Sequence, residues 1–236
     1  MPEVRVNARL SINKLGEYLE ASAGRRERIL RDQKFPKEVV VLYYKEAADA
    51  ICEYIRSGFD VASLDKQYQE LGEKPTTTVR QVKRLNDCLQ AFEKFHNLSE
   101  TELISKLDGF RILCAPMAPK EGTISIEGVE VSLRPEFYIR GTDKRGNETK
   151  GLLKLYISRN QPLTKYTAEA IAAVSIEHLG CLSDPPGRPD ASIVLVADVF
   201  AQAIYVAPKS TKRLMQDVTA ACREIARSWE QIESVD

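Results

Sequence analysis

The sequence predicts an α+β protein, with a helical N-terminal region followed by a mixed β-sheet core and flanking helices. Apolar residues recur at helical spacing through residue 108, whereas from residue 110 they alternate with polar residues as in half-buried strands. An alanine-rich segment at 164–180 and an apolar run at 191–200 then indicate a crossover helix and a buried strand. We therefore expect two domains, a helical one at 1–108 and an α/β one at 109–236.

The N-terminal region contains six expected helices, several of which begin or end at residues that favour helix termini. Ser11 and Asp60 are expected N-caps, because their side chains can accept a hydrogen bond from the first helical turn. Gly58 is an expected C-cap, and Ser99 with Glu102 has the pattern of a capping box. The expected helices span residues 11–21, 24–34, 37–58, 61–73, 79–97 and 99–108.

Strands are expected from residue 110 onward. Alternation places Val129 and Val131 on one face of their strand, and Gly146 with Asn147 favours a turn with positive φ between two later strands. Four segments are expected to form a meander: 110–116, 123–133, 136–141 and 151–158. After the crossover helix and buried strand, the chain ends in two further expected elements, a short strand at 203–208 and an amphipathic helix at 212–232.

Composition argues against several classes of protein. Lys plus Arg and Asp plus Glu each total 34, so no overall basic field attracts nucleic acid, and any such contact must be local. The five cysteines are scattered and form no CxxC pair, which disfavours a disulfide framework or zinc knuckle and favours the reducing cytoplasm. No segment reaches the roughly 20 apolar residues of a membrane helix, so we expect no membrane partner. The motifs GxGxxG, Walker A and GxSxG are absent, which disfavours dinucleotide binding, triphosphate binding and serine hydrolysis.

The second half of the chain carries two motif positions within a particular order of elements. The segment RPEF places Glu136 after a proline on one expected strand, and LLK places Lys154 on the next. Together with the order of helix, three-stranded meander, crossover helix and buried strand, these positions resemble the restriction-endonuclease-like, or PD-(D/E)XK, superfamily. In that superfamily the second strand supplies an acid, and the third supplies an acid, one spacer residue and a lysine.

The resemblance implies a metal-dependent nuclease whose catalytic residues are Glu136 and Lys154. Glu136 would hold Mg²⁺, and Lys154 would orient water or stabilise the developing charge. Leu152 stands where the superfamily has its second acid, so loss of activity is also implied. A helical acid contributes in the superfamily, and the candidates for that position are Glu93, Glu100 and Glu102.

The same two residues have a simpler interpretation. Alternation along the strand places Leu152, Lys154 and Tyr156 on one face, and hairpin pairing can bring Glu136 beside Lys154. The two charges would then form an ordinary cross-strand ion pair on an amphipathic sheet. Asp198, at the end of the buried strand, also has two interpretations, as a residue that takes part in chemistry or as one that forms a turn. Turn formation is the commoner role of such an Asp.

Local basic groups are the candidate contacts for nucleic-acid phosphates, because phosphate binding requires charge rather than base-specific geometry. One group lies on the helix at 79–97, and a second surrounds the start of the last helix, where the helix dipole favours anions. The six candidates in these two groups are Arg80, Lys83, Arg84, Lys209, Lys212 and Arg213. A third group, on the helix at 24–34, consists of Arg25, Arg26, Arg28 and Arg31. All three are also compatible with solvated helix surfaces. An arginine-rich helix at 24–34 follows the helix at 11–21 in the order of a helix-turn-helix.

The sequence thus predicts a protein that engages DNA or RNA through a divergent nuclease-like core, with Mg²⁺ needed only if the core cuts. The alternative is a non-enzymatic interaction or scaffold subunit with a protein partner or a second copy of the chain. Balanced charge and the hydrophobic final helix containing Trp229 motivate that alternative. A third candidate, a transcriptional regulator, depends on the helix-turn-helix.

Overall fold

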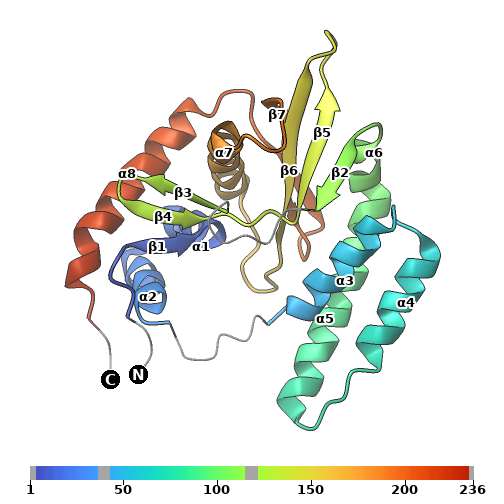
Figure 1. The fold of residues 1–236 in the computed structure, drawn as a ribbon. Helices are drawn as coiled ribbons and strands as arrows, with labels where there is room; N and C mark the ends of the chain where they lie inside the picture. Colours follow the sequence, from blue (N-terminus) through green and yellow to red (C-terminus); the bar gives the residue numbers. More distant parts are fainter. Residues whose placement is uncertain (1–3, 37–42, 115–121, 234–236) are drawn as a thin grey trace.

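The structure is a computed structural model and describes residues 4–36, 43–114 and 122–233 (Figure 1). About 51% of the chain is helix and 21% is strand, which confirms the α+β class. No helix among these residues is long and apolar enough to cross a membrane.

A five-stranded mixed sheet forms the centre of the fold, in the order β2-β5-β6-β7-β8. Its strands are β2 (Arg111–Cys114), β5 (Phe137–Thr142), β6 (Glu148–Tyr156), β7 (Arg188–Asp198) and β8 (Ala203–Val206). Neighbouring strands are antiparallel except β6 and β7, which run parallel and are joined by helix α7 (Lys165–Cys181). The expected crossover helix and buried strand are both present.

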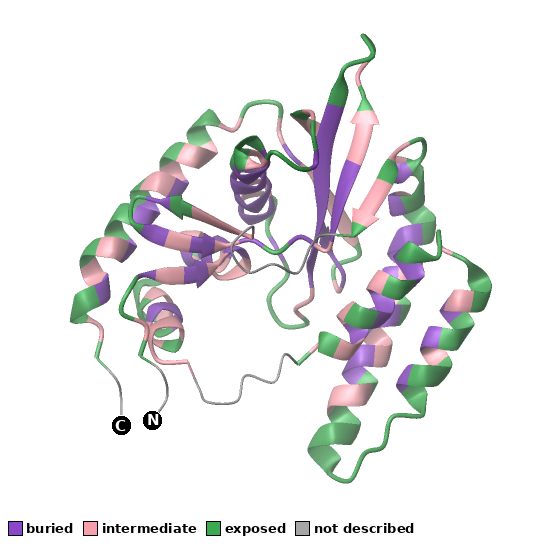
Figure 2. Cartoon of the chain, in the orientation of Figure 1, coloured by how far each residue is buried: buried purple, intermediate pink, exposed green. Residues whose placement is uncertain are grey.

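The helices form two layers, one on each face of this sheet (Figure 1). The apolar layer on one side combines α3, α4 and α5 with Phe137, Leu153 and Leu195 of the sheet. On the other side, α1, α7 and α8 pack with Tyr138 and Leu152. Figure 2 shows that burial is concentrated in β6 and α7. The helices in these layers are α1 (Ile12–Glu20), α2 (Ala23–Lys34), α3 (Lys45–Arg56), α4 (Val61–Gly72), α5 (Val79–Leu98), α6 (Ile104–Leu107) and α8 (Lys212–Ser228).

A second, three-stranded sheet corrects the expected meander. The segment 123–133 is a hairpin of β3 (Thr123–Ile126) and β4 (Val129–Ser132), and β4 also pairs with β1 (Arg9–Ser11). Glu127 and Gly128 both have positive φ, at 50° and 80°, and they reverse the chain between the two strands. The meander of the large sheet therefore consists of β2, β5 and β6 alone.

Contacts cross the expected boundary between residues 108 and 109. β1 lies beside β4, and α1 packs against α7. A Cβ atom added at Gly16 would lie 2.9 Å from Thr167 Cγ2, so glycine permits the close approach of these two helices. The first 34 residues thus contact the C-terminal half of the chain, although the division into two domains stays a prediction.

The helix termini match the sequence at some positions and not at others. Ser11 and Asp60 accept hydrogen bonds from the N–H groups of their first turns, as expected. The capping box at Ser99 is wrong, because α5 continues through a π-helical turn, η1 (Ser99–Leu103), into α6. The Ser99 hydroxyl instead donates to the His96 carbonyl. The helix expected at 37–58 begins at Lys45, and residues 37–42 lie outside the described ranges.

Candidate functional site

The β5–β6 hairpin brings Glu136 and Lys154 together. Phe137 pairs with Leu153, which places the residue before β5 beside Lys154 on the neighbouring strand. Lys154 Nζ lies 2.8 Å from Glu136 Oε1 and donates a second hydrogen bond to the Arg134 carbonyl, also at 2.8 Å. The Lys154 side chain is 9% exposed and the Glu136 side chain 19% exposed. Glu136 and Lys154 therefore lie on one face of the sheet, as alternation and hairpin pairing allow. Their side chains form an ion pair that is mostly buried.

Both oxygens of the Glu136 carboxylate are engaged. Oε1 accepts from Lys154, and Oε2 accepts from the backbone N–H of Leu155 at 2.7 Å. The backbone N–H of Glu136 donates to the Leu153 carbonyl, so the hydrogen-bond ladder extends one residue before the start of β5. This arrangement fixes the entry of the chain into the hairpin.

Among the residues that the structure describes, those around this pair form no cluster of ligands for magnesium. Leu152 is fully buried in the apolar layer on the α7 side, where the superfamily pattern places an acid. The described residues contain no group of three His, Cys, Asp or Glu side chains that could hold a metal ion. Mg²⁺ prefers octahedral oxygen coordination, and one carboxylate whose oxygens are both committed does not provide it.

The helical acids considered for this site come from α5 and η1, which belong to the layer of α3, α4 and α5. Glu100 accepts a 3.5 Å hydrogen bond from Tyr54, and Glu102 pairs with Lys106 at 3.2 Å. Glu93 borders a hollow along α5, the helix that packs on the face opposite α7. Glu100 and Glu102 are thus engaged with partners of their own, and the suggestion that one of the three glutamates completes the Glu136 site stays a prediction.

The six predicted phosphate contacts fall into two separate regions. Arg80, Lys83 and Arg84 are on the first turns of α5, at the lower right of Figure 1, whereas α8 begins at the upper left. Arg80 and Lys83 are exposed, and Arg84 forms an ion pair with Glu46. The structure does not combine the two groups into one surface.

The second group surrounds the start of α8. Lys209 and Lys212 line a shallow hollow of about 730 Å³, together with Thr211 and Arg223. Thr211 makes no capping hydrogen bond through its side chain. Arg213 is exposed and does not line this hollow. Each residue of the group stays a predicted phosphate contact.

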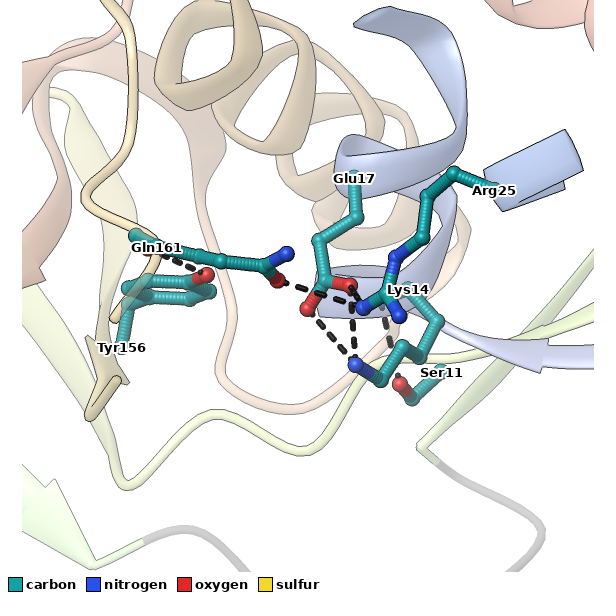
Figure 3. Close-up of polar contacts among 6 residues, drawn as sticks. All are labelled: Ser11, Lys14, Glu17, Arg25, Tyr156 and Gln161. Carbon is teal, nitrogen blue, oxygen red and sulfur yellow. Dashed lines mark hydrogen bonds and ion pairs between the residues drawn. The ribbon is translucent and has the colours of Figure 1, made fainter. Parts of the chain in front are cut away.

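A polar network near the N-terminus was not predicted from the sequence (Figure 3). Glu17 of α1 accepts from Lys14 at 2.7 Å and from Arg25 of α2 at 3.0 Å. Arg25 also donates to the Gln161 side chain at 3.3 Å, and the Tyr156 hydroxyl donates to the Gln161 carbonyl at 2.8 Å. The network ties α1 and α2 to the loop that follows β6. Its sequence signal is limited to a glutamate three residues after a lysine, a common pattern on helices.

The arginine-rich helix α2 directs most of its charge toward the protein itself. Arg26 donates to the carbonyls of Tyr18 and Leu19, and its guanidinium lies 4.9 Å from the Tyr18 ring centre. Arg31 pairs with Glu27 at 2.5 Å. These contacts pack α2 against α1, and the helix-turn-helix interpretation stays a prediction.

A second buried carboxylate, Asp198, shapes the chain at the end of β7. Its oxygens accept from the backbone N–H groups of Leu163 at 2.8 Å and Ala201 at 3.1 Å. Burial raises the pKa of Asp198, and these backbone hydrogen bonds oppose the rise. The residue fixes two loops, in agreement with the turn role expected from the sequence.

A buried aspartate on α5 was also missed. Asp87 Oδ2 accepts from the Tyr43 hydroxyl at 2.7 Å, and Oδ1 lies 2.6 Å from Arg159 Nη1. Asp87 is 7% exposed, yet the sequence gives only an acid among basic residues on an amphipathic helix. Its partners are 44 and 72 residues away, so no local pattern could have identified it.

Comparisons with known proteins give no assignment. No family model matches the chain, and no curated protein sequence matches it.

Proposed function

We propose that the protein binds nucleic acid with a restriction-endonuclease-like core that does not cut. The observation that carries this proposal is the Glu136–Lys154 pair, which occupies two motif positions of that superfamily on adjacent strands. The order of α5, β2, β5, β6, α7 and β7 supports the same resemblance. Leu152 and the fully engaged carboxylate support the absence of cleavage.

In this proposal the ion pair has a structural role. Lys154 neutralises Glu136 and holds the Arg134 carbonyl, while Glu136 binds the Leu155 N–H. Nucleic acid is held by local cations rather than by an overall charge, since the chain is neutral. The five cysteines are free thiols, which supports the proposed cytoplasmic location.

The test combines binding and cleavage on one set of samples. Fluorescein-labelled single- and double-stranded DNA and RNA are mixed with the protein, with Mg²⁺, with Mn²⁺ and with chelator. We expect binding that weakens as salt rises, with intact oligonucleotides under all three conditions. Circular dichroism on the same samples confirms that each variant is folded.

Three outcomes separate the alternatives. Metal-dependent cleavage that both Glu136→Ala and Lys154→Ala abolish would show an active nuclease and overturn the non-cutting proposal. Cleavage that both variants retain indicates a contaminating nuclease. The binding result alone then decides between the nucleic-acid proposal and a protein-interaction role. Failure of the folded protein to bind any of the four nucleic acids would reject the proposal in favour of a scaffold or other protein-interaction role.

A further inference from the structure

A polar hollow of about 840 Å³ lies between the helical region and the loop after β6. Tyr43 and Tyr44 line it from the segment before α3, and Lys83 and Asp87 line it from α5. The opposite wall is the segment 157–161. Neither Glu136 nor Lys154 borders this hollow, so it is separate from the hairpin ion pair.

The wall of the hollow includes a cation, the Arg159 guanidinium, which Asp87 holds in place. The two oxygens of Asp87 are held by Tyr43 and Arg159, so the buried negative charge is compensated. The Arg159 side chain is 50% exposed, and its contact with Asp87 uses one of the five N–H donors of a guanidinium. Arg159 is therefore positioned by a buried partner while much of its surface faces solvent.

Tyr43 gives the hollow an aromatic surface. The residue is 37% exposed, and its ring packs edge-on against Tyr44 with 5.0 Å between ring centres. Tyr44 in turn packs against Phe200 at 5.4 Å. The hydrogen bond to Asp87 raises the pKa of Tyr43 to about 12, so the hydroxyl stays protonated and neutral at physiological pH. The ring is thus held in place from two sides.

Two smaller hollows extend this one into a groove. One, of about 520 Å³, shares Asp87 and Arg159 with it and continues along α5 to Glu93. The other, of about 260 Å³, shares Gln161 and continues to Arg25, with Glu17 and Glu20 also in its lining. Because they share lining residues, the three hollows follow one another across the junction between the helical region and the core.

We propose that this groove binds a nucleotide unit, with the base against Tyr43 and the phosphate between Lys83 and Arg159. The inference rests on the proposed nucleic-acid function and names the surface and the form of the strand. A single strand exposes base faces that stack on an aromatic side chain, whereas a duplex covers them. A free nucleotide has the same chemistry as one unit of a strand. Cations together with an aromatic ring are the combination that single-strand binding sites use.

The experiment measures the anisotropy of fluorescein-labelled single-stranded DNA and RNA, with duplex DNA and adenosine monophosphate as further arms. Tyr43→Leu should weaken single-strand binding about 5- to 150-fold, the usual loss for one stacked base. Tyr43→Phe should retain most of the affinity because it keeps the ring. Both variants lose the hydrogen bond to Asp87, so the difference between their affinities reports the contribution of the aromatic ring.

Lys83→Ala tests the phosphate contact by its salt dependence. The slope of log K against log salt concentration should become less negative by about 0.7, the value for one phosphate contact on a single strand. Lys66→Ala is the matched control, because this α4 side chain is 69% exposed and borders none of the three hollows. It should leave both affinity and slope unchanged.

The outcomes distinguish this inference from the function on which it rests. Strand binding that Tyr43→Leu and Lys83→Ala leave unchanged would reject the groove while the nucleic-acid function stands. Binding of duplex DNA but of no single strand would also reject the groove while the nucleic-acid function stands. If the wild-type protein binds adenosine monophosphate but no strand, the nucleotide site stands and the nucleic-acid function fails. If it binds none of these probes, both are wrong.

Discussion

The sheet face that packs on α3, α4 and α5 carries apolar side chains and the uncharged Thr149, whereas the opposite face carries the charged residues Lys150, Lys154 and Asp198 among its apolar residues. Both faces are closed by helices, and both strands β6 and β7 contribute to each. The difference is therefore one of side-chain chemistry and not of exposure.

Each of these three charged side chains binds the backbone of a loop or a strand end. Lys150 Nζ donates to the Leu182 carbonyl at 2.6 Å, Lys154 binds the Arg134 carbonyl, and Asp198 binds the Leu163 N–H. The apolar face provides packing energy, and the mixed face fixes the connections between elements. The charges on this face therefore require no catalytic explanation.

The largest effect should come from placing a carboxylate on each face in turn. Leu153 pairs with Phe137 and Leu195, so Leu153→Glu buries a charge without a partner and should cost at least about 4 kcal/mol. Leu152→Glu lies two residues from Lys150 and from Lys154 on the same face. At about 7 Å, Lys150 should recover roughly 2 kcal/mol before other costs, whereas Lys154 should recover less because Glu136 already neutralises it. Urea unfolding measures both free energies.

The comparison of the two faces depends on the difference in free energy of unfolding between Leu152→Glu and Leu153→Glu. Lys66→Glu, on the exposed surface of α4, controls for the effect of adding a negative charge. Equal losses of stability at positions 152 and 153 would show that the lysines do not make the α7 side more tolerant of an acid.

A smaller effect is expected when the ion pair itself is broken. Lys154→Met keeps the length of the side chain but leaves the Glu136 carboxylate without its cation and the Arg134 carbonyl without its donor. Removing one partner of a buried pair usually costs 3–5 kcal/mol, and the 19% exposure of Glu136 reduces this to about 2–3 kcal/mol. The free energy of unfolding by urea is again the measurement.

A double-mutant cycle separates the pair from the packing of the lysine stem. Glu136→Gln retains the length and an acceptor oxygen, so the coupling energy with Lys154→Met reports the charge interaction. Lys66→Met, at an exposed ion pair on α4, should change stability by no more than about 0.5 kcal/mol. A Lys154→Met loss as small as this control would remove the structural role proposed for the pair.

Strand alternation predicted part of this face, although not Lys150 or Asp198. The period of two places Lys154 with Leu152 and Tyr156, and pairing brings Glu136 beside it, as the structure has it. The order of the crossover helix and buried strand followed from composition in the same way. These features depend on residues near one another in sequence or on a single hairpin, which is why local patterns predict them.

The rest depends on packing between distant segments. The β3–β4 hairpin contains a non-glycine residue, Glu127, at positive φ, so its turn has a weaker sequence signal than an Asn-Gly pair. The helical acids are assigned to a face only by the packing of α5 on the sheet. The cluster around Asp87 joins three separate segments, and no spacing rule connects them.

The smallest predicted effect concerns His178, which lies on α7 beside the mixed face. The residue is 1% exposed, and its Nε2 atom has no hydrogen-bond partner among the described residues. Burial lowers the pKa of His178 below its ordinary value of 6.5. The unfolded chain therefore binds a proton at a pH where the folded chain does not.

The sign of the pH dependence follows from this difference in proton binding. Below pH 6.5 the unfolded state gains the proton first, so His178 lowers the stability of the fold as pH falls toward its folded pKa. One proton gives a slope of at most about 1.4 kcal/mol per pH unit. His178→Met removes the titrating ring at similar volume, so its stability should fall less between pH 6.5 and about pH 5. Urea unfolding of both proteins across this range measures the difference, and parallel curves would mean that His178 is not the group that makes the mixed face sensitive to acid.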